Sequence, residues 1–221
     1  MKRRAVIFAN GELKKPQELM RYLKPDDFLV AADGGVNHIL RLHLQPNLVI
    51  GDLDSVTASE RTVLERQKAE ISQFPCDKDE TDLELALQEV ISRGFNTIMI
   101  AAGLGGRLDQ TLGNIFLLLQ PQYEKHDIRF EDGKQEVILI RDACEIHGNP
   151  GDSVSLLPLL GPVEGIVTEG LKFTLDNETL YPYKTRGISN EIKNTLSKVS
   201  IKHGFLLCVH SRKMEEKTNQ F

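Results

Sequence analysis

The sequence predicts an α/β fold with a doubly wound, mainly parallel sheet, followed by a smaller antiparallel β-sandwich domain. Up to about residue 135, short apolar runs alternate with amphipathic helical stretches. This alternation is typical of β-α-β crossovers and hence of parallel strands. Beyond that point no long helical period appears, and strand-like runs follow one another between turn residues. We therefore predict an α/β domain over 1–135 and a β-sandwich domain over 136–221.

Five strands are expected in the first domain, each a short apolar run followed by polar or small residues. They are "AVIFAN" (5–10), "FLVAADGG" (28–35), "LVIGD" (48–52), "ISQFP" (71–75) and "TIMIAAG" (97–103). A helix is predicted over 83–91 from the helical spacing of its apolar residues, Leu83, Ala86, Leu87, Val90 and Ile91. A second apolar stripe predicts another helix, and its members are Leu108, Leu112, Ile115, Phe116 and Leu119.

The second domain is expected to consist of strands. Its apolar runs are "EVILI", "DSVSLLPLL", "VEGIVTEGLKFTL", "TLYPYKT" and "VSIKHGFLLCVH". Asp176-Asn177 and His203-Gly204 are expected to form hairpin turns, because Asn and Gly accept turn conformations readily. The last residues, 211–221, are expected to be a frayed tail.

Composition argues against several classes of partner. The chain has 221 residues, 40% of them hydrophobic and 27% charged, with a formal net charge of −5. Nucleic acids and anionic membranes are usually bound by clustered Lys and Arg, so we expect neither partner.

No apolar run approaches a transmembrane span or a signal-peptide core. Cys76, Cys144 and Cys208 form no metal-binding pair and suit a reducing compartment, so a cytoplasmic protein is expected. The six histidines show no ligand spacing and are assigned no role.

Polar residues follow the C-terminal ends of the predicted strands. Parallel strands end at one edge of the sheet, where open α/β sheets bind their ligands, so these residues are expected to share one site. They are Asn10-Gly11, Asp33-Gly34-Gly35, Asp52 and Asp54, Asp77-Lys78-Asp79, and the segment "GLGGRLD" (103–109).

The clustered carboxylates predict a bound cation. Hard oxygen ligands without His or Cys favour Mg²⁺ over zinc, and Mg²⁺ is usually completed by substrate phosphates. The segment 103–109 suits a phosphate, because small residues allow close approach of the backbone, a helix starting near Asp109 offers free N–H groups, and Arg107 supplies a charged fork. The sequence therefore predicts a magnesium and polyphosphate site.

Each feature also has a purely structural explanation. An Asp-x-Asp pair after a strand can form a turn and a helix cap. Asp79 and Asp82 would favour the macrodipole of the following helix without any ligand. The glycine segment matches neither the Walker pattern nor Gly-x-Gly-x-x-Gly, because Leu108 takes the place of the last glycine. The shared sheet edge favours the functional interpretation.

Four motifs in this order and spacing resemble those of the thiamine pyrophosphokinase (thiamine diphosphokinase) family. They are "ADGG" (32–35), "GDLDS" (51–55), "KDETD" (78–82) and "GGRLDQ" (105–110). In the C-terminal half, "EGLKFTLDN" (169–177) and "GISNE" (187–191) look like the thiamine-binding segments of that family. The resemblance implies a homodimer with active sites at the subunit interface. It also implies transfer of the diphosphoryl group of ATP to the hydroxyl of thiamine, which gives thiamine diphosphate and AMP.

The resemblance further implies roles for single residues. Magnesium would be held by Asp52, Asp54 and Asp82. The nucleotide and its phosphates would be bound by Asp33, Lys78, Thr81, Arg107, Asp109 and Gln110. Catalysis would depend on Asp54, Asp82, Arg107 and Asp109, with Asp82 and Asp109 both open as acceptors of the hydroxyl proton. Thiamine would be met by Phe173, Ser189 and Asn190.

Phe173 departs from the family pattern. Animal members carry Trp in a "GLKW" segment, whereas this chain has Phe173 and no Trp. Phe keeps an aromatic face but offers less area and a weaker cation contact. An aromatic residue in a strand can equally belong to the core of the domain, and both interpretations stay open at this point.

Two other classes of protein share features with this sequence. "LVIGDLDSV" resembles the nucleophile loop of haloacid-dehalogenase-type phosphatases. In those enzymes the loop usually follows the first strand, whereas here it follows the third, and the later Gly-Asp-x-x-x-Asp motif is missing. A non-catalytic nucleotide or metabolite sensor would use the same groups, but the number of Asp residues favours catalysis.

Overall fold

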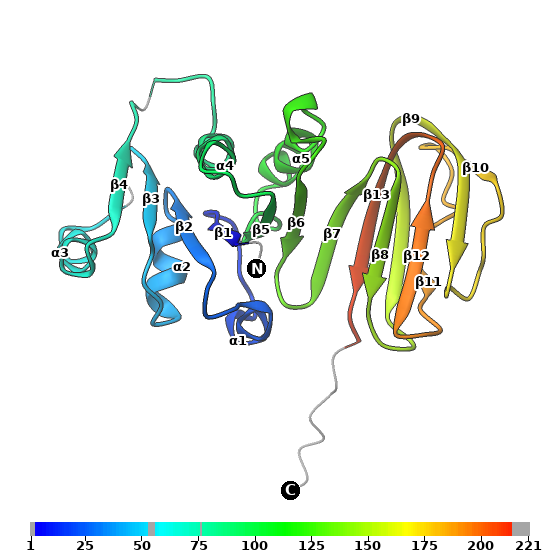
Figure 1. The fold of residues 1–221 in the computed structure, drawn as a ribbon, viewed down its shortest axis with the longest axis horizontal. Coiled ribbons are helices and arrows are strands. Elements are labelled where there is room, and N and C mark those ends of the chain that lie inside the picture. The colour runs from blue at the N-terminus through cyan, green and yellow to red at the C-terminus, as the bar shows by residue number, and fades with distance from the viewer. Residues whose placement is uncertain (1–2, 53–55, 76, 214–221) are drawn as a thin grey trace, which may run out of the picture. The chain divides into compact units, whose positions relative to one another are not determined.

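The computed structural model describes residues 3–52, 56–75 and 77–213 and divides into two compact units, Met1–Gly133 and Lys134–Phe221 (Figure 1). The division falls two residues before the domain limit expected from the sequence. None of the helices in the described parts of the chain is long and apolar enough to cross a membrane.

The first unit is built on a parallel sheet with the strand order β4-β3-β2-β1-β5-β6. Its strands are β1 (Arg4–Phe8), β2 (Phe28–Ala32), β3 (Leu48–Gly51), β4 (Glu70–Gln73), β5 (Thr97–Ala101) and β6 (Asp127–Glu131). The chain builds outward from β1 to β4 and then returns to the other side of β1 with β5. The order of strands therefore reverses between β1 and β5, and ligands of such sheets bind at this kind of switch point.

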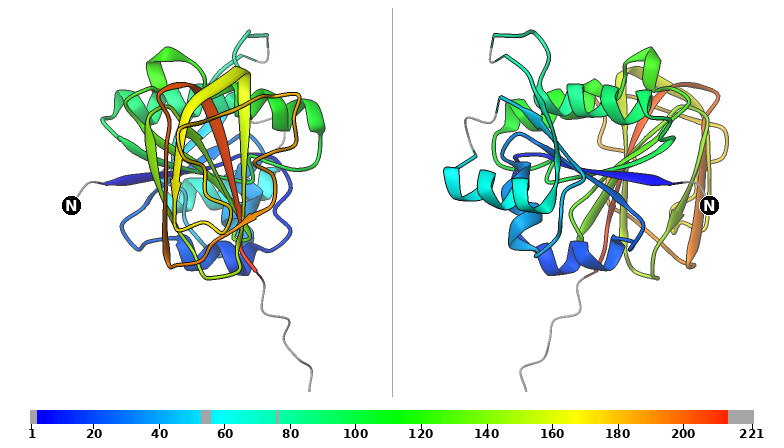
Figure 2. Two further views of the ribbon diagram at one scale, coloured as in Figure 1. Left: turned by 90° about the vertical axis from the view of Figure 1, so that its right-hand side faces the viewer. Right: turned by 60° about the vertical axis from the view of Figure 1, so that its left-hand side comes forward.

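Helices cover both faces of this sheet (Figure 2). They are α1 (Pro16–Leu19), α2 (Gly35–Arg41), α3 (Ala58–Gln67), α4 (Asp82–Ser92) and α5 (Leu108–Leu117), with 3₁₀ turns at Met20–Tyr22 and Pro121–Tyr123. Leu19 of α1, Ile39 of α2 and Leu64 of α3 share one buried cluster with alternate residues of the strands. The opposite face is covered by α4, which packs on β1, β2 and β3 through its buried stripe. The predicted doubly wound fold is confirmed.

Some predicted elements of the first unit differ in detail. The five predicted strands occur, and the helix expected over 83–91 lies within α4. Strand β6 was not expected, because Asp127, Arg129 and Glu131 interrupt its apolar pattern. The second stripe lies on a helix, α5, except for Leu119, which follows its end. Leu108, Leu112 and Phe116 are exposed to solvent. Periodicity thus located the helix without revealing what its apolar face contacts.

The second unit is antiparallel, with the strand order β7-β13-β9-β12-β8 and with β10 and β11 paired to β9. Its strands are β7 (Gln135–Ile140), β8 (Ala143–His147), β9 (Ser153–Glu169), β10 (Glu178–Leu180), β11 (Asn190–Glu191), β12 (Leu196–Ser200) and β13 (His203–Ser211). The first part of β9 pairs with β13 and its last residues pair with β12, so one long strand takes part in both layers around a common apolar core.

Three expectations for the second unit need correction. The runs "DSVSLLPLL" and "VEGIVTEGLKFTL" were expected as two strands, but 153–169 forms the single strand β9, which changes direction where Leu160 and Gly165 have φ angles of 61° and 67°. His203-Gly204 is not a hairpin turn: it opens β13 at a register shift, with Gly204 at φ 103°. Ser211, expected in the tail, is the last residue of β13. Asn177 does lie in a turn, with φ 54°, directly before β10.

Candidate active site

A cleft of about 620 Å³ lies at the C-terminal ends of the parallel strands. The loops after β1, β2, β3, β4 and β5 all contribute to its walls. Of the residues predicted from the sequence, the cleft brings together Asp33, Asp52, Lys78, Thr81, Asp82, Arg107 and Gln110. Asp54 lies outside the described residues. Asp109 is not part of the cleft lining, but its carboxylate bonds to Arg107 and to the backbone N–H of Gln110, which both line the cleft.

The segment Asp33-Gly34-Gly35 is shaped by close approach of the loop after β1. The side-chain nitrogen of Asn10 donates to Oδ2 of Asp33 at 3.1 Å. A Cβ atom on Gly34 would come within 2.3 Å of the Asn10 side chain, and one on Gly35 within 1.8 Å of the Phe8 carbonyl oxygen. Gly35 therefore requires glycine, whereas a side chain at Gly34 would displace that of Asn10, which bonds to the Asp33 carboxylate in the wall of the cleft.

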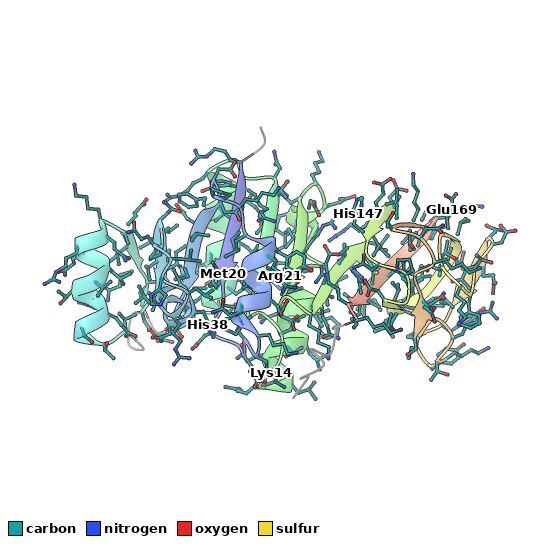
Figure 3. The ribbon with its side chains drawn as sticks, turned by 90° about the horizontal axis from the view of Figure 1, so that it is seen from below. Lys14, Met20, Arg21, His38, His147 and Glu169 are labelled. Carbon is teal, nitrogen blue, oxygen red and sulfur yellow. The ribbon has the colours of Figure 1, made fainter. Side chains whose placement is uncertain are left out.

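His38 fixes the same loop from the other side. His38 lies on α2 (Figure 3). Its Nε2 lies 2.9 Å from the carbonyl oxygen of Gly11. The Gly11 N–H donates to the carbonyl oxygen of Ala102 at 2.9 Å, and a Cβ atom on Gly11 would lie 2.3 Å from that oxygen. The loop after β1 is thus held between α2 and the turn after β5.

Lys78 and Asp82 form an ion pair inside the cleft, with 2.6 Å between Nζ and Oδ1. Thr81 caps α4 by accepting a hydrogen bond from the N–H of Glu84 at 3.2 Å, which places Asp82 in the first turn of the helix. Asp82 thus lies in the first turn of α4, as its structural explanation required, and it also lines the cleft. Both functions are compatible, because a helix N-terminus favours a carboxylate in either case.

The glycine-rich loop leads into α5. Gly105 and Gly106 have φ angles of 85° and 74°, and the N–H of Gly105 donates to Oγ1 of Thr111 at 3.1 Å. Arg107 occupies the N-cap position of α5 without capping it through its side chain. The first N–H groups of this helix are therefore suited to an anion.

Arg107 is paired with Asp109, with 3.1 Å between Nε and Oδ1, and both side chains are largely exposed. The hydrogen bond from Arg107, assisted by the backbone N–H of Gln110, lowers the pKa of Asp109 below its usual range. The same pairing raises the pKa of Arg107. The guanidinium is permanently charged and lies at the rim of the cleft, where it can turn toward a phosphate.

The described carboxylates offer a donor set of hard oxygens, which suits a divalent cation such as Mg²⁺. Asp52 and Asp82 both line the cleft. Within the described ranges, no group of three or more His, Cys, Asp or Glu side chains could hold a metal ion by itself. An ion there would need Asp54 or the oxygens of a substrate to complete its coordination, as is usual for Mg²⁺.

Three predicted residues lie in the second unit. The ring of Phe173 is 64% exposed, which excludes the alternative that it belongs to the core. Asn190 is buried, and its amide bonds to backbone: it donates to the carbonyl of Phe173 at 2.7 Å and accepts from the N–H groups of Phe173 and Glu191 at 3.0 and 2.8 Å. Ser189 is exposed with φ 58°, and its N–H donates to Oγ of Ser155 at 3.0 Å. Phe173 and Ser189 are thus presented to solvent.

Some residues of the cleft were not predicted as site residues. They include Glu12, Glu80 and Asn114, whereas Asn10 was expected at this sheet edge without a role of its own. Asn114 donates to the carbonyl of Gly103 at 2.7 Å and lies one helical turn after Gln110, so helical spacing could have indicated it. Glu12 follows β1 at the same sheet edge as the other polar loops, and that position was the available signal for it.

Comparison with known proteins accounts for both units. Residues 19–130 match the family model of the thiamin pyrophosphokinase catalytic domain. Residues 126–206 match that of the thiamin pyrophosphokinase vitamin B1 binding domain. The chain belongs to the thiamin pyrophosphokinase family. The resemblance inferred from the sequence motifs is thereby confirmed.

Relatives in this family are similar over most of their length. Thiamine pyrophosphokinase of Bacillus subtilis (strain 168) is 28% identical over 208 residues, which cover 93% of this chain and 97% of the relative. Thiamin pyrophosphokinase 1 of Caenorhabditis elegans is 28% identical over 197 residues, 79% of this chain and 74% of the relative. The crystal structure of thiamine pyrophosphokinase from B. subtilis matches with a TM-score of 0.84 at 26% identity, over 96% of this chain and 100% of that one. That of thiamin pyrophosphokinase from Geobacillus thermodenitrificans matches with a TM-score of 0.83 at 25% identity, over 96% and 99%.

Proposed function

We propose that the protein is an enzyme with thiamine diphosphokinase activity, which transfers the diphosphoryl group of ATP to the hydroxyl of thiamine and yields thiamine diphosphate and AMP. The observation that carries this proposal is the cleft at the switch point of the first unit, in a chain whose two halves match both family models. Carboxylates from three successive loops and a helix N-terminus with Arg107 together suit a metal-bound polyphosphate.

The first unit is proposed to bind ATP with Mg²⁺. Asp52, Asp82 and, from the sequence, Asp54 would hold the ion, which neutralises charge on the phosphoryl oxygens when it is bound. Lys78 and Arg107 would contact the phosphates. The remaining predicted residues of the cleft, Asp33, Thr81 and Gln110, would position the nucleotide.

In the proposed reaction, the hydroxyl oxygen of thiamine forms a bond to the β-phosphorus of ATP. The bond from that phosphorus to the α,β-bridging oxygen breaks, and AMP leaves with this oxygen. The proton of the hydroxyl passes to a carboxylate of the cleft. Of the two candidates, Asp109 is the poorer acceptor, because Arg107 lowers the pKa of its carboxyl and because it does not line the cleft. Catalysis otherwise consists of alignment and charge neutralisation.

The second unit is proposed to bind thiamine through Phe173 and Ser189. An exposed aromatic face suits the cationic, aromatic thiazolium ring. Asn190 would support this contact by holding the backbone of Phe173 rather than by touching the substrate. The proposed division of labour is thus nucleotide and metal in the first unit and thiamine in the second.

A homodimer is proposed because α5 exposes an apolar stripe. Leu108, Leu112 and Phe116 are 71%, 43% and 47% exposed. They recur at intervals of four residues, so they form one face of the helix next to Arg107. A second copy of the chain that covered this face would bring the subunit interface to the edge of the active site.

We further propose that the protein acts in the cytoplasm and binds neither nucleic acid nor membrane, in keeping with its charge.

The phosphatase alternative is disfavoured by topology. The Asp-x-Asp pair follows β3, which is two strands away from the central β1.

Incubation of the purified protein with ATP, Mg²⁺ and thiamine, followed by phosphorus NMR, tests the proposed thiamine diphosphokinase activity. Equal amounts of AMP and thiamine diphosphate are expected. ADP or free phosphate would indicate another phosphotransfer reaction, and no turnover would favour a sensor.

A further inference from the structure

The charges in the cleft are unbalanced in a way that singles out Lys78. Among the described lining residues, five side chains are acidic and two are basic, and the acidic ones are Glu12, Asp33, Asp52, Glu80 and Asp82. One basic residue, Arg107, is 73% exposed and already paired with Asp109. Lys78 is therefore the cation that this structure places among the carboxylates.

Lys78 is paired with one of the carboxylates proposed to hold the metal ion. Its side chain is 14% exposed, and Nζ lies 2.6 Å from Oδ1 of Asp82, which is 23% exposed. The same Nζ lies 5.5 Å from the ring centroid of Phe74, at the end of β4. Since water is largely excluded from both partners, the pair is less screened than an ion pair at the surface.

We propose that Lys78 is an internal counter-cation for Asp82, which a divalent ion displaces and which then moves to the phosphates of the nucleotide. A divalent ion bound to a carboxylate gives the complex a net positive charge, which repels a neighbouring ammonium group. Lys has a flexible four-carbon side chain and a compact charge. Rotations about its side-chain bonds can therefore move Nζ while the backbone stays in place. Metal binding and phosphate binding are thereby coupled through one side chain.

The inference rests on the proposed function only in that a divalent ion and phosphates occupy this cleft. Lys78→Met keeps an aliphatic stem and removes the charge, and Lys78→Arg keeps the charge. Binding of Mn²⁺ alone is measured by electron paramagnetic resonance of the free ion. Binding of ATP in the presence of EDTA is measured by calorimetry.

Lys78→Met is expected to bind Mn²⁺ about fivefold more tightly than the unaltered protein, because the competing cation is gone. It is expected to bind metal-free ATP about tenfold more weakly, because a charged phosphate contact is lost. Lys78→Arg should stay close to the unaltered protein in both assays. In an Asp82→Asn background, Lys78→Met should no longer tighten Mn²⁺ binding, which isolates the pair.

Equal or weaker Mn²⁺ binding by Lys78→Met would overturn the proposal, and so would tightening that persists in the Asp82→Asn background. A lower melting temperature of Lys78→Met with unchanged Mn²⁺ affinity would show that Lys78 only braces the start of α4. Neither assay involves turnover. A protein that behaves as expected here but forms no thiamine diphosphate would therefore refute the proposed function and leave this inference standing.

Discussion

Asn190 holds the backbone of Phe173 at both of its polar groups, with Nδ2 2.7 Å from the Phe173 carbonyl oxygen and Oδ1 3.0 Å from its nitrogen. Asn190 is buried, whereas the ring of Phe173 is exposed. The two residues are 17 positions apart in the chain. A buried amide thus fixes the backbone from which an exposed aromatic ring projects.

Asn190→Ala is expected to leave two backbone groups of Phe173 without their partner. The free energy of unfolding should fall by about 1–3 kcal/mol. The KM for thiamine should rise about tenfold, while the KM for ATP stays unchanged, because only the second unit is altered. Steady-state kinetics and urea unfolding measure both effects.

The exposed Asn194 provides a matched control, since Asn194→Ala should change neither quantity. Phe173→Ala should raise the KM for thiamine similarly but change stability by less than about 0.5 kcal/mol, because the ring is already in solvent. An unchanged KM for thiamine in both Asn190→Ala and Phe173→Ala would refute the thiamine assignment.

Asp52→Asn and Asp54→Asn should each lower kcat by about 100-fold or more, because an amide preserves the shape but not the charge of a metal ligand. Thermal unfolding followed by circular dichroism should show little change. Asp79→Asn serves as a control, because Asp79 is exposed and does not line the cleft. Near-normal activity of Asp52→Asn or Asp54→Asn would remove that residue from the proposed set of metal ligands.

A buried acid in the second unit should govern stability at low pH. Burial raises the pKa of Asp152, but hydrogen bonds from the N–H groups of Asn149 and Lys213 and from His210 outweigh burial and bring the pKa below its usual range. A carboxyl whose pKa is lower in the folded protein stabilises the fold above its unfolded pKa. That contribution is lost as the pH falls through the folded value.

Unfolding by urea should therefore become easier below about pH 4, as carboxylates are protonated. Asp152→Asn should cost about 1–3 kcal/mol at pH 7, because it removes the acceptor charge from buried hydrogen bonds, including one with His210 at 3.1 Å. In this variant the free energy of unfolding should also fall less steeply at low pH than in the unaltered protein. An equally steep fall in the variant would show that other carboxyl groups dominate the pH dependence.

Phe116→Arg should convert the proposed dimer to a monomer in sedimentation velocity, because it places a charge in the apolar stripe of α5. Stability of the monomer should change little, since the side chain is 47% exposed. Leu160→Arg is the control, at an exposed position of the second unit. A monomeric unaltered protein, or a dimer that persists in Phe116→Arg, would contradict the proposed interface.

The order of elements was predictable because buried parallel strands are apolar on both faces, as "AVIFA" and "TIMIA" are. The position of the cleft was predictable because polar residues such as Asp33 and Asp52 directly follow strands of this sheet. Strand β6 escaped prediction because charges alternate with its apolar residues.

Contacts between a side chain and a distant backbone group leave no pattern in the sequence. His38 bonds to the carbonyl of Gly11 across 27 residues, and Asn190 bonds to Phe173 across 17. Any residue has a backbone carbonyl, so the identity of the partner carries no signal. The stripe of α5 shows a related limit, because helical period indicates an apolar face but not what covers it.

The central claim, attack on the β-phosphorus of ATP, is tested most directly with ATP that carries ¹⁸O in the α,β-bridging position, incubated with Mg²⁺, thiamine and the protein. Mass spectrometry of the products should find the label in AMP and none in thiamine diphosphate, because the β-phosphorus loses its bond to the bridging oxygen. Labelled ADP with thiamine monophosphate would indicate attack on the γ-phosphorus, and adenylated thiamine with labelled pyrophosphate would indicate attack on the α-phosphorus. Either result would contradict the proposed reaction.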